Sequence, residues 1–162
     1  MSVMVRMKLQ EGKLAPDFSL EDKDGKRWTL GKLQHDFYVI YFYPKDSTPG
    51  CTIEANEFNV LEKEFTKINC KVIGISGGNS ASKEKFCSNN NLHILLLSDS
   101  DHRVGKAYGV YGEKQFMGKK FEGYHRVTFV LDKNLTIVTV YGAVKAAGHA
   151  AQVLAFVKGL KK

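Results

Sequence analysis

A lone cysteine, Cys51, stands at the end of the stretch "YPKDSTPGC", where the chain is suited to nucleophilic chemistry. An apolar run precedes this stretch, and apolar residues at helical spacing follow it. Thr48 is a residue type that begins helices and Pro49 suits the first helical position, so we expect Cys51 in the first turn of a helix. Backbone N–H groups there have no partner within the helix, and the positive end of the helix dipole favours an anion. A cysteine in that place is stabilised as the thiolate, its nucleophilic form.

The position of Cys51 also suits a small oxygen-bearing substrate. The free N–H groups of a first turn can donate hydrogen bonds to it, and the carboxyl end of a buried strand is where open α/β sheets carry their sites. A nucleophile has to meet its substrate, so we expect the Cys51 thiol to be open to solvent. The residue alone leaves a second interpretation, a buried structural cysteine at the start of a helix.

Two further cysteines, Cys70 and Cys87, bring the total to three, with no CxxC pair and no zinc-site spacing. Any disulfide among them would be transient in a reducing compartment. Cys70 precedes the apolar run "VIGIS", which favours a packed thiol over a catalytic one. The five histidines do not stand with carboxylates or cysteines at metal-ligand spacing. We therefore expect neither a metal nor an organic cofactor.

The elements that must position Cys51 alternate between strands and helices. The N-terminal part predicts a β-hairpin with its turn at Asp24-Gly25, and the C-terminal part predicts a hairpin around Lys133-Asn134 followed by a helix. The alternation between them predicts an α/β, thioredoxin-like fold, with a central mixed β-sheet flanked by helices, in a single domain over residues 1–162. The segment 112–122 is expected to be a loop. The expected strands are 16–20, 27–30, 36–43, 71–76, 92–97, 126–132 and 136–141, and the expected helices follow Thr48 and cover 80–91, 101–108 and 149–160.

The composition is typical of a globular protein, with 43% hydrophobic and 25% charged residues. No apolar run is long enough to cross a bilayer, and the N-terminal "MSVMVRMKLQEGK" lacks the features of a secretory signal, so we expect a cytoplasmic protein without a membrane partner. The net charge of +7 raises the alternative of a nucleic-acid-binding protein. The charge is spread along the chain, which favours a solvated basic surface and no nucleic-acid partner.

Pro44, Thr48 and Cys51 fit the pattern P-x-x-x-T-x-x-C, and the longer stretch "FYPKDSTPGCTIEANEF" resembles the peroxiredoxin family, in particular the peroxiredoxin Q or bacterioferritin comigratory protein subfamily. The stretches "LAPDFSLEDKDGK" and "YGVYGEKQFMGKKFEGYHRVTFVLDKN" are similar to the opening and late segments of the same family. The resemblance covers most of the chain and implies a thioredoxin fold and thiol-dependent reduction of hydrogen peroxide and organic hydroperoxides. A thiol–disulfide oxidoreductase would share that fold, but the chain lacks the CxxC motif.

Carried over by position, the resemblance makes Cys51 the peroxidatic cysteine, whose thiolate attacks the O–O bond and becomes a sulfenic acid. It implies that Thr48 hydrogen-bonds the peroxide or the thiolate and that Pro44 shields the sulfenic acid. Arg126 is implied to hold Cys51 as the thiolate and to polarise the peroxide, since a guanidinium stays charged and stabilises negative charge on oxygen. Without the motif, a surface ion pair at the start of a strand would be the favoured interpretation of Arg126. Glu54 fits the same motif and would act by hydrogen bonding or by orienting Arg126.

Many members of the subfamily carry a second cysteine five residues after the first, where this chain has Asn56. The resemblance to another subgroup makes Cys87 the resolving cysteine, with a disulfide to Cys51 that thioredoxin or a similar dithiol protein would reduce. The segment "KEKFCSNNN" holds three asparagines, which form helix poorly, so it can open at low cost. We expect the two cysteines to lie apart before oxidation and their segments to unwind to meet. The alternative is an exposed free thiol at Cys87 and an external resolving thiol. The resemblance also implies a monomer.

Overall fold

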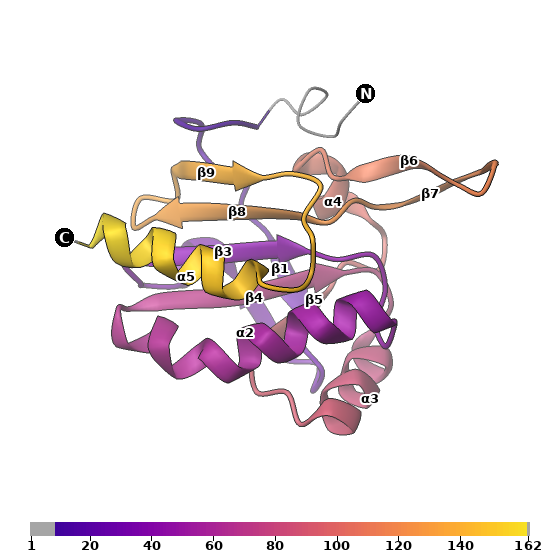
Figure 1. Cartoon of the computed structure of the whole chain (residues 1–162), viewed down its shortest axis with the longest axis horizontal. Helices are drawn as coiled ribbons and strands as arrows, with labels where there is room; N and C mark the ends of the chain where they lie inside the picture. The colour runs from indigo at the N-terminus through magenta and orange to yellow at the C-terminus, as the bar shows by residue number, and fades with distance from the viewer. Residues whose placement is uncertain (1–8, 162) are drawn as a thin grey trace.

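A seven-stranded mixed β-sheet forms the centre of the computed structural model, which describes residues 9–161 (Figure 1). The strands lie in the order β2-β1-β5-β4-β3-β8-β9, with β3, β4 and β5 parallel and the remaining neighbours antiparallel. The mixed sheet and the N-terminal hairpin at its edge are as the sequence predicts. In chain order the strands are β1 (Ser19–Glu21), β2 (Arg27–Thr29), β3 (Phe37–Phe42), β4 (Cys70–Ser76), β5 (Leu95–Ser98), β8 (Val127–Asp132) and β9 (Ile137–Tyr141).

Helices α2, α3 and α4 lie between strands in the chain and α5 follows the last strand; α2 and α5 lie next to each other on one face of the sheet (Figure 1). The observed bounds of the last three helices fall within two residues of those expected from the sequence. The expected strands at 16–20 and 92–97 both begin three residues later, as β1 and β5. The helices are α2 (Pro49–Lys67), α3 (Ser80–Asn90), α4 (Arg103–Ala107) and α5 (His149–Leu160), with a short 3-10 helix, η1 (Leu30–Lys32).

The interior strand β3 is buried on both faces, and its side chains point into two hydrophobic clusters, one on each face of the sheet. Tyr38, Ile40 and Phe42 point into the cluster on one face, and Val39 and Tyr41 point into the cluster on the other. This split follows from the two-residue period of a strand, and it explains why the sequence of β3 is apolar without alternation. The second cluster receives side chains from α2, α3 and α5.

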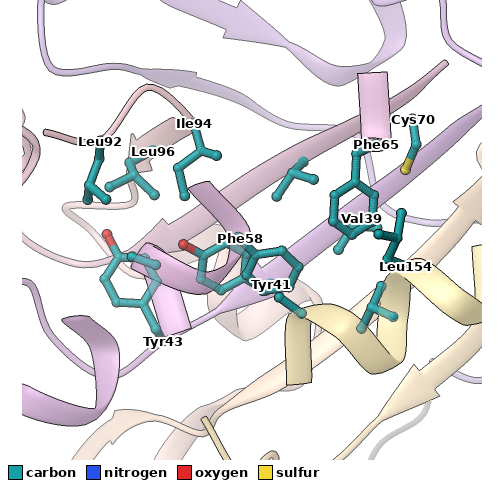
Figure 2. Close-up of a cluster of buried hydrophobic side chains, with 14 of the residues drawn as sticks. Val39, Tyr41, Tyr43, Phe58, Phe65, Cys70, Leu92, Ile94, Leu96 and Leu154 are labelled. Carbon is teal, nitrogen blue, oxygen red and sulfur yellow. The ribbon is translucent and has the colours of Figure 1, made fainter. Parts of the chain in front are cut away.

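Helix α2 is held against that second cluster by one face of its surface. Cys51, Ala55, Phe58 and Phe65 are each no more than 1% exposed, at a spacing that matches the helical repeat. The ring of Phe58 stacks on Tyr41 of β3 with 4.6 Å between centroids (Figure 2). Burying each Phe side chain contributes about 1.5–3 kcal/mol, so the sheet fixes the position of the helix that begins at the candidate nucleophile.

The expectation of a loop at 112–122 is wrong, because this segment forms a β-hairpin of β6 (Tyr111–Phe116) and β7 (Lys119–Tyr124). The hairpin extends away from the main sheet (Figure 1). Its tip turns at Met117 and Gly118, whose φ angles are 53° and 80°, the left-handed values of a tight hairpin turn. Much of the hairpin is exposed, so its sequence shows no apolar alternation that could have revealed the strands.

Candidate active site

Cys51 is the third residue of α2, which begins after the loop that follows β3. Thr48 occupies the N-cap position and Pro49 the first helical position, as expected from the sequence. The Thr48 side chain does not cap the helix, because its Oγ1 atom donates to the carbonyl oxygen of Lys45 at 2.8 Å. The N–H groups of Gly50 and Cys51 belong to the first turn, which has no partners within the helix for them. Cys51 therefore lies at the positive end of the helix dipole.

Arg126 precedes β8, the antiparallel neighbour of β3, and its side chain reaches the start of α2. Its Nη2 atom lies 3.5 Å from Sγ of Cys51 in a hydrogen-bonding geometry. Burial opposes the charge of Arg126, but Cys51 and Glu54 outweigh this effect and hold its pKa above the ordinary value. A Cβ atom added at Gly50 would stand 3.1 Å from Nη2, so the guanidinium uses space that glycine leaves free. The alternative of a surface ion pair for Arg126 is wrong, since its side chain is only 18% exposed.

Glu54 holds the other side of the same guanidinium. Nη1 of Arg126 donates to Oε1 of Glu54 at 2.7 Å, and the Glu54 side chain is fully buried. Burial raises the pKa of Glu54 to about 7, although Arg126 acts in the opposite direction. The second carboxylate oxygen has no hydrogen-bond partner among the described residues. Of the two ways in which the sequence allowed Glu54 to act, orientation of Arg126 has a contact to support it.

The expectation that the Cys51 thiol is open to solvent is wrong for this conformation. Cys51 is 1% exposed and belongs to the hydrophobic cluster that includes Tyr41, Ala55 and Phe58. The physical reason is that the face of α2 that carries Cys51 is also the face that packs on the sheet. Access of even a small molecule to Sγ therefore requires a local movement.

Pro44 and Thr48 lie at the two ends of the loop between β3 and α2. Pro44 is partly buried and lines a cavity of about 320 Å³ together with Tyr111 and Tyr124 of the β6–β7 hairpin. Arg126 is thus in direct contact with both Cys51 and Glu54, while Pro44 and Thr48 lie in the loop that leads to them. The roles of these two residues stay predictions.

Cys87 lies near the end of α3 and is 5% exposed, so the alternative of an exposed thiol is wrong. It belongs to the same hydrophobic cluster as Cys51, and burial raises its pKa to about 11. The helix ends at Asn90, and Asn91 adopts the left-handed conformation, with φ 51°. This agrees with the expected end of the helix in the asparagine run. The thiol also lines a cavity of about 270 Å³ that it shares with Trp28.

Cys70 is the first residue of β4 and is 4% exposed, within the second hydrophobic cluster (Figure 2). Burial raises the pKa of Cys70 to about 12, which keeps it a protonated thiol. The interpretation of Cys70 as a packed thiol is confirmed. All three cysteines are free thiols.

A buried polar network that the sequence did not reveal lies beside this site. Lys83 of α3 is fully buried and makes an ion pair of 2.9 Å with Asp46, which lies in the loop between Pro44 and Thr48. One signal was available, because Lys83 precedes the apolar Phe86 and Cys87 by three and four residues and so shares their helical face.

Lys114 of β6 is a second missed cation. Its Nζ atom donates to the carbonyl oxygen of Tyr124 at 2.8 Å. Burial lowers the pKa of Lys114, Arg126 lowers it further, and Cys51 raises it, so the ammonium is within electrostatic reach of the candidate site. No pattern in the sequence could have found this contact, because it depends on the unexpected β6–β7 hairpin.

Within residues 9–161, His, Cys, Asp and Glu side chains form no group of three or more that could hold a metal ion. In the same part of the chain, no helix is both long and apolar enough to span a bilayer.

Comparisons with known proteins converge on one family. Residues 12–140 match the model of the AhpC/TSA family. A relative from Helicobacter pylori (strain J99) is 45% identical over 91% of this chain and 97% of its own, and the relative named peroxiredoxin Bcp from Escherichia coli (strain K12) is 39% identical over 93% and 96%. A solved structure of the bacterioferritin comigratory protein of Xanthomonas campestris, described for its alkyl peroxide reduction activity, superposes with a TM-score of 0.85 at 39% identity, covering 91% of this chain and 94% of that one.

Proposed function

Because the chain belongs to the AhpC/TSA family of peroxiredoxins and is a thiol-dependent peroxidase, we propose that its reaction takes place at Cys51. The supporting observation is the position of the Arg126 guanidinium, 3.5 Å from Sγ, at the N-terminus of α2. A fixed positive charge and free backbone N–H groups both favour a sulfur anion there. Neither Cys70, on a strand, nor Cys87, near the end of α3, lies at a helix N-terminus, and burial raises the pKa of both.

In the first step the Cys51 thiolate attacks the terminal oxygen of a hydroperoxide. An S–O bond forms, the O–O bond breaks, and the leaving alkoxide or hydroxide takes a proton and departs as alcohol or water. The sulfur is oxidised by two electrons to a sulfenic acid, while the peroxide is reduced by two. Arg126 stabilises the negative charge that develops on oxygen, and Glu54 orients the guanidinium. Both hydrogen peroxide and organic hydroperoxides are substrates in this scheme, the latter in line with the X. campestris relative.

Thr48 and Pro44 complete the site in this proposal. The single hydroxyl proton of Thr48 is donated to Lys45, which leaves the oxygen free to accept the O–H of a hydroperoxide. Thr48 therefore binds the peroxide as an acceptor, and Pro44 shields the sulfenic acid. Because Cys51 is 1% exposed, the loop of residues 44–50 has to move for the peroxide to enter.

In the second step the Cys87 thiol attacks the sulfenic sulfur of Cys51, forming a disulfide and releasing water. Thioredoxin or a similar small dithiol protein then reduces this disulfide by thiol–disulfide exchange and is itself oxidised. We place the protein in the cytoplasm, because a cycle that uses free thiols needs a reducing compartment. The monomeric state is proposed from the subfamily resemblance alone.

Mass spectrometry of the non-reduced protein after one equivalent of hydrogen peroxide tests this function. We expect one disulfide, between Cys51 and Cys87, with Cys70 still a thiol. The Cys51→Ser variant loses peroxide consumption in stopped-flow measurements, while Cys70→Ser is the matched control and keeps it. The Cys87→Ser variant reacts once and then stalls at the sulfenic acid or overoxidises when thioredoxin is supplied. Full multi-turnover activity of Cys87→Ser would reject Cys87 as the resolving residue and favour an external thiol.

A further inference from the structure

Lys83 is a fully buried lysine whose charge is completely satisfied by the protein. Its Nζ atom donates to Oδ2 of Asp46 at 2.9 Å, to Oγ of Ser76 at 3.0 Å and to the carbonyl oxygen of Gly77 at 2.7 Å. An ammonium group has three donors, so all of them are used. Burial lowers the pKa of Lys83, and Asp46 acts against this change. Charges are seldom buried in this way unless they are paired, which makes the contact specific.

Asp46 accepts hydrogen bonds from two parts of the fold, the end of β3 and helix α3. The hydroxyl of Tyr43, just after β3, donates to Oδ1 at 2.6 Å, and the hydroxyl of Ser82 on α3 donates to Oδ2 at 2.6 Å. With Lys83, three side chains therefore hold this one carboxylate, which is only 4% exposed. The next residue, Ser47, has a φ angle of 64°, a left-handed value that non-glycine residues adopt at a cost of about 1–2 kcal/mol. Contacts at Asp46 offset that strain.

The pair connects the two segments that carry the proposed reacting cysteines. Asp46 stands midway between Pro44 and Thr48 in the loop that leads to Cys51. Lys83 precedes Cys87 by one helical turn on the same face of α3. For α3 to unwind and deliver Cys87, Lys83 has to leave its buried position, and Asp46 then loses its charge partner.

We propose that the Asp46–Lys83 ion pair is a latch that positions the Cys51 loop and the Cys87 helix together, so that the two segments open as one unit. This inference rests on the proposed function, in which Cys51 and Cys87 form a disulfide. In the closed state the two charges neutralise each other in the interior, and in the open state both are hydrated. Removal of one partner leaves the other buried without its counter-charge, which destabilises only the closed state. A single substitution therefore shifts the equilibrium towards the open state.

Hydrogen exchange of the reduced protein tests the latch independently of any peroxide. In Lys83→Met we expect the amides of α3 and of residues 45–52 to exchange about tenfold faster or more, with no such change in β4. Asp46→Asn has the same effect, and the double variant changes less than the sum of the two, as expected for coupled residues. Lys85→Met, at an exposed lysine of the same helix, is the matched control. Ser88→Gly loosens α3 at an exposed position and leaves the Asp46–Lys83 pair in place, so we expect the exchange of residues 45–52 to rise together with that of α3.

The second measurement is the rate of disulfide formation after one equivalent of hydrogen peroxide. It is read by quenching and mass spectrometry and by the fluorescence of Trp28, the single tryptophan, which lines the same cavity as Cys87. We expect this rate to rise about tenfold in Lys83→Met, in proportion to the open fraction.

Three results would overturn the latch. The first is exchange in Lys83→Met that equals exchange in Lys85→Met. The second is exchange that rises equally in β4, which indicates an ordinary loss of global stability. The third is faster hydrogen exchange in Lys83→Met without faster formation of the disulfide. If Lys83→Met does not fold, Asp46→Asn is judged by the same criteria. A wild-type protein that consumes no peroxide refutes the proposed function, while the exchange experiment still decides whether the two segments are coupled.

Discussion

The buried carboxylate of Glu54 gives a prediction whose magnitude follows from its environment. The group is fully buried, it pairs with Arg126 at 2.7 Å, and its pKa is raised to about 7 because burial outweighs the ion pair. Replacement by Gln keeps the shape and the acceptor for Arg126 but removes the ionisation. We therefore expect Glu54→Gln to change how the free energy of unfolding depends on pH.

The sign of the effect follows from proton binding. In the unfolded chain Glu54 loses its proton near the ordinary value of 4.5, whereas in the folded protein it keeps the proton up to about 7. Between these values the folded state binds more protons, so the stability contributed by Glu54 is full below 4.5 and falls as the pH rises through about 7. Each pH unit between the two pKa values corresponds to about 1.4 kcal/mol. The wild type thus loses about 3 kcal/mol across this range.

Urea unfolding of wild type and Glu54→Gln under reducing conditions, at pH values from 4.5 to 8, measures the difference directly. We expect the free energy of unfolding of the variant to rise relative to that of the wild type as the pH rises, by about 3 kcal/mol in total, with most of this rise complete by pH 8. Other titrating groups are common to both proteins and cancel in the difference. Two curves of unfolding free energy against pH that run parallel over the whole range would refute the reasoning. A variant whose free energy of unfolding falls relative to the wild type as the pH rises would show that the ion pair outweighs burial.

Three further predictions concern other residues of the same core. Arg126→Met is expected to slow the reaction of the reduced protein with hydrogen peroxide about 100-fold or more and to move the pH–rate profile of this reaction to higher pH. Stopped-flow rates that match the wild type at every pH would exclude Arg126 from the site. Burial lowers the pKa of His149 to about 4, so this residue binds fewer protons in the folded than in the unfolded protein. The wild type therefore loses about 3 kcal/mol of unfolding free energy as the pH falls from 6.5 through 4. In urea titrations at acid pH we expect His149→Gln to lose less, and equal losses in the two proteins would contradict this. Because the pKa of Cys70 is about 12, iodoacetamide at pH 8 is expected to leave Cys70 unmodified in the folded protein; modification at the rate seen in urea would show that it is accessible.

Local sequence was enough to place Cys51 in the fold. Thr48 and Pro49 are strong signals for the start of a helix, and the apolar run of β3 marks a strand buried on both faces. Both signals depend on neighbouring residues only, so they do not need tertiary information. The candidate partner Arg126 lies far along the chain, and only the family resemblance pointed to it.

Features that depend on tertiary contacts were missed or predicted wrongly. The burial of Cys51 is set by how α2 packs on the sheet, which a motif does not encode. The Thr48 hydroxyl donates to the carbonyl oxygen of Lys45 because the loop between β3 and α2 turns and brings these two residues together. Asp46 and Lys83 are charged residues in polar stretches, and such residues are normally solvated. Their pairing requires a loop and a helix from different parts of the chain to meet.

The distribution of buried side chains explains why opening can be confined to one side of the molecule. Beyond its first turn, α2 is anchored by Phe58 and Phe65, each 0% exposed. Among the described residues of α3, only Lys83, Phe86 and Cys87 are buried, and one of these carries a charge. A helix with so little apolar contact depends on its polar contact to stay docked, and a polar contact can be exchanged for water when the helix leaves. The sheet thus keeps the body of α2 in place, while the loop before Cys51 and helix α3 supply the movement that the proposed second step requires.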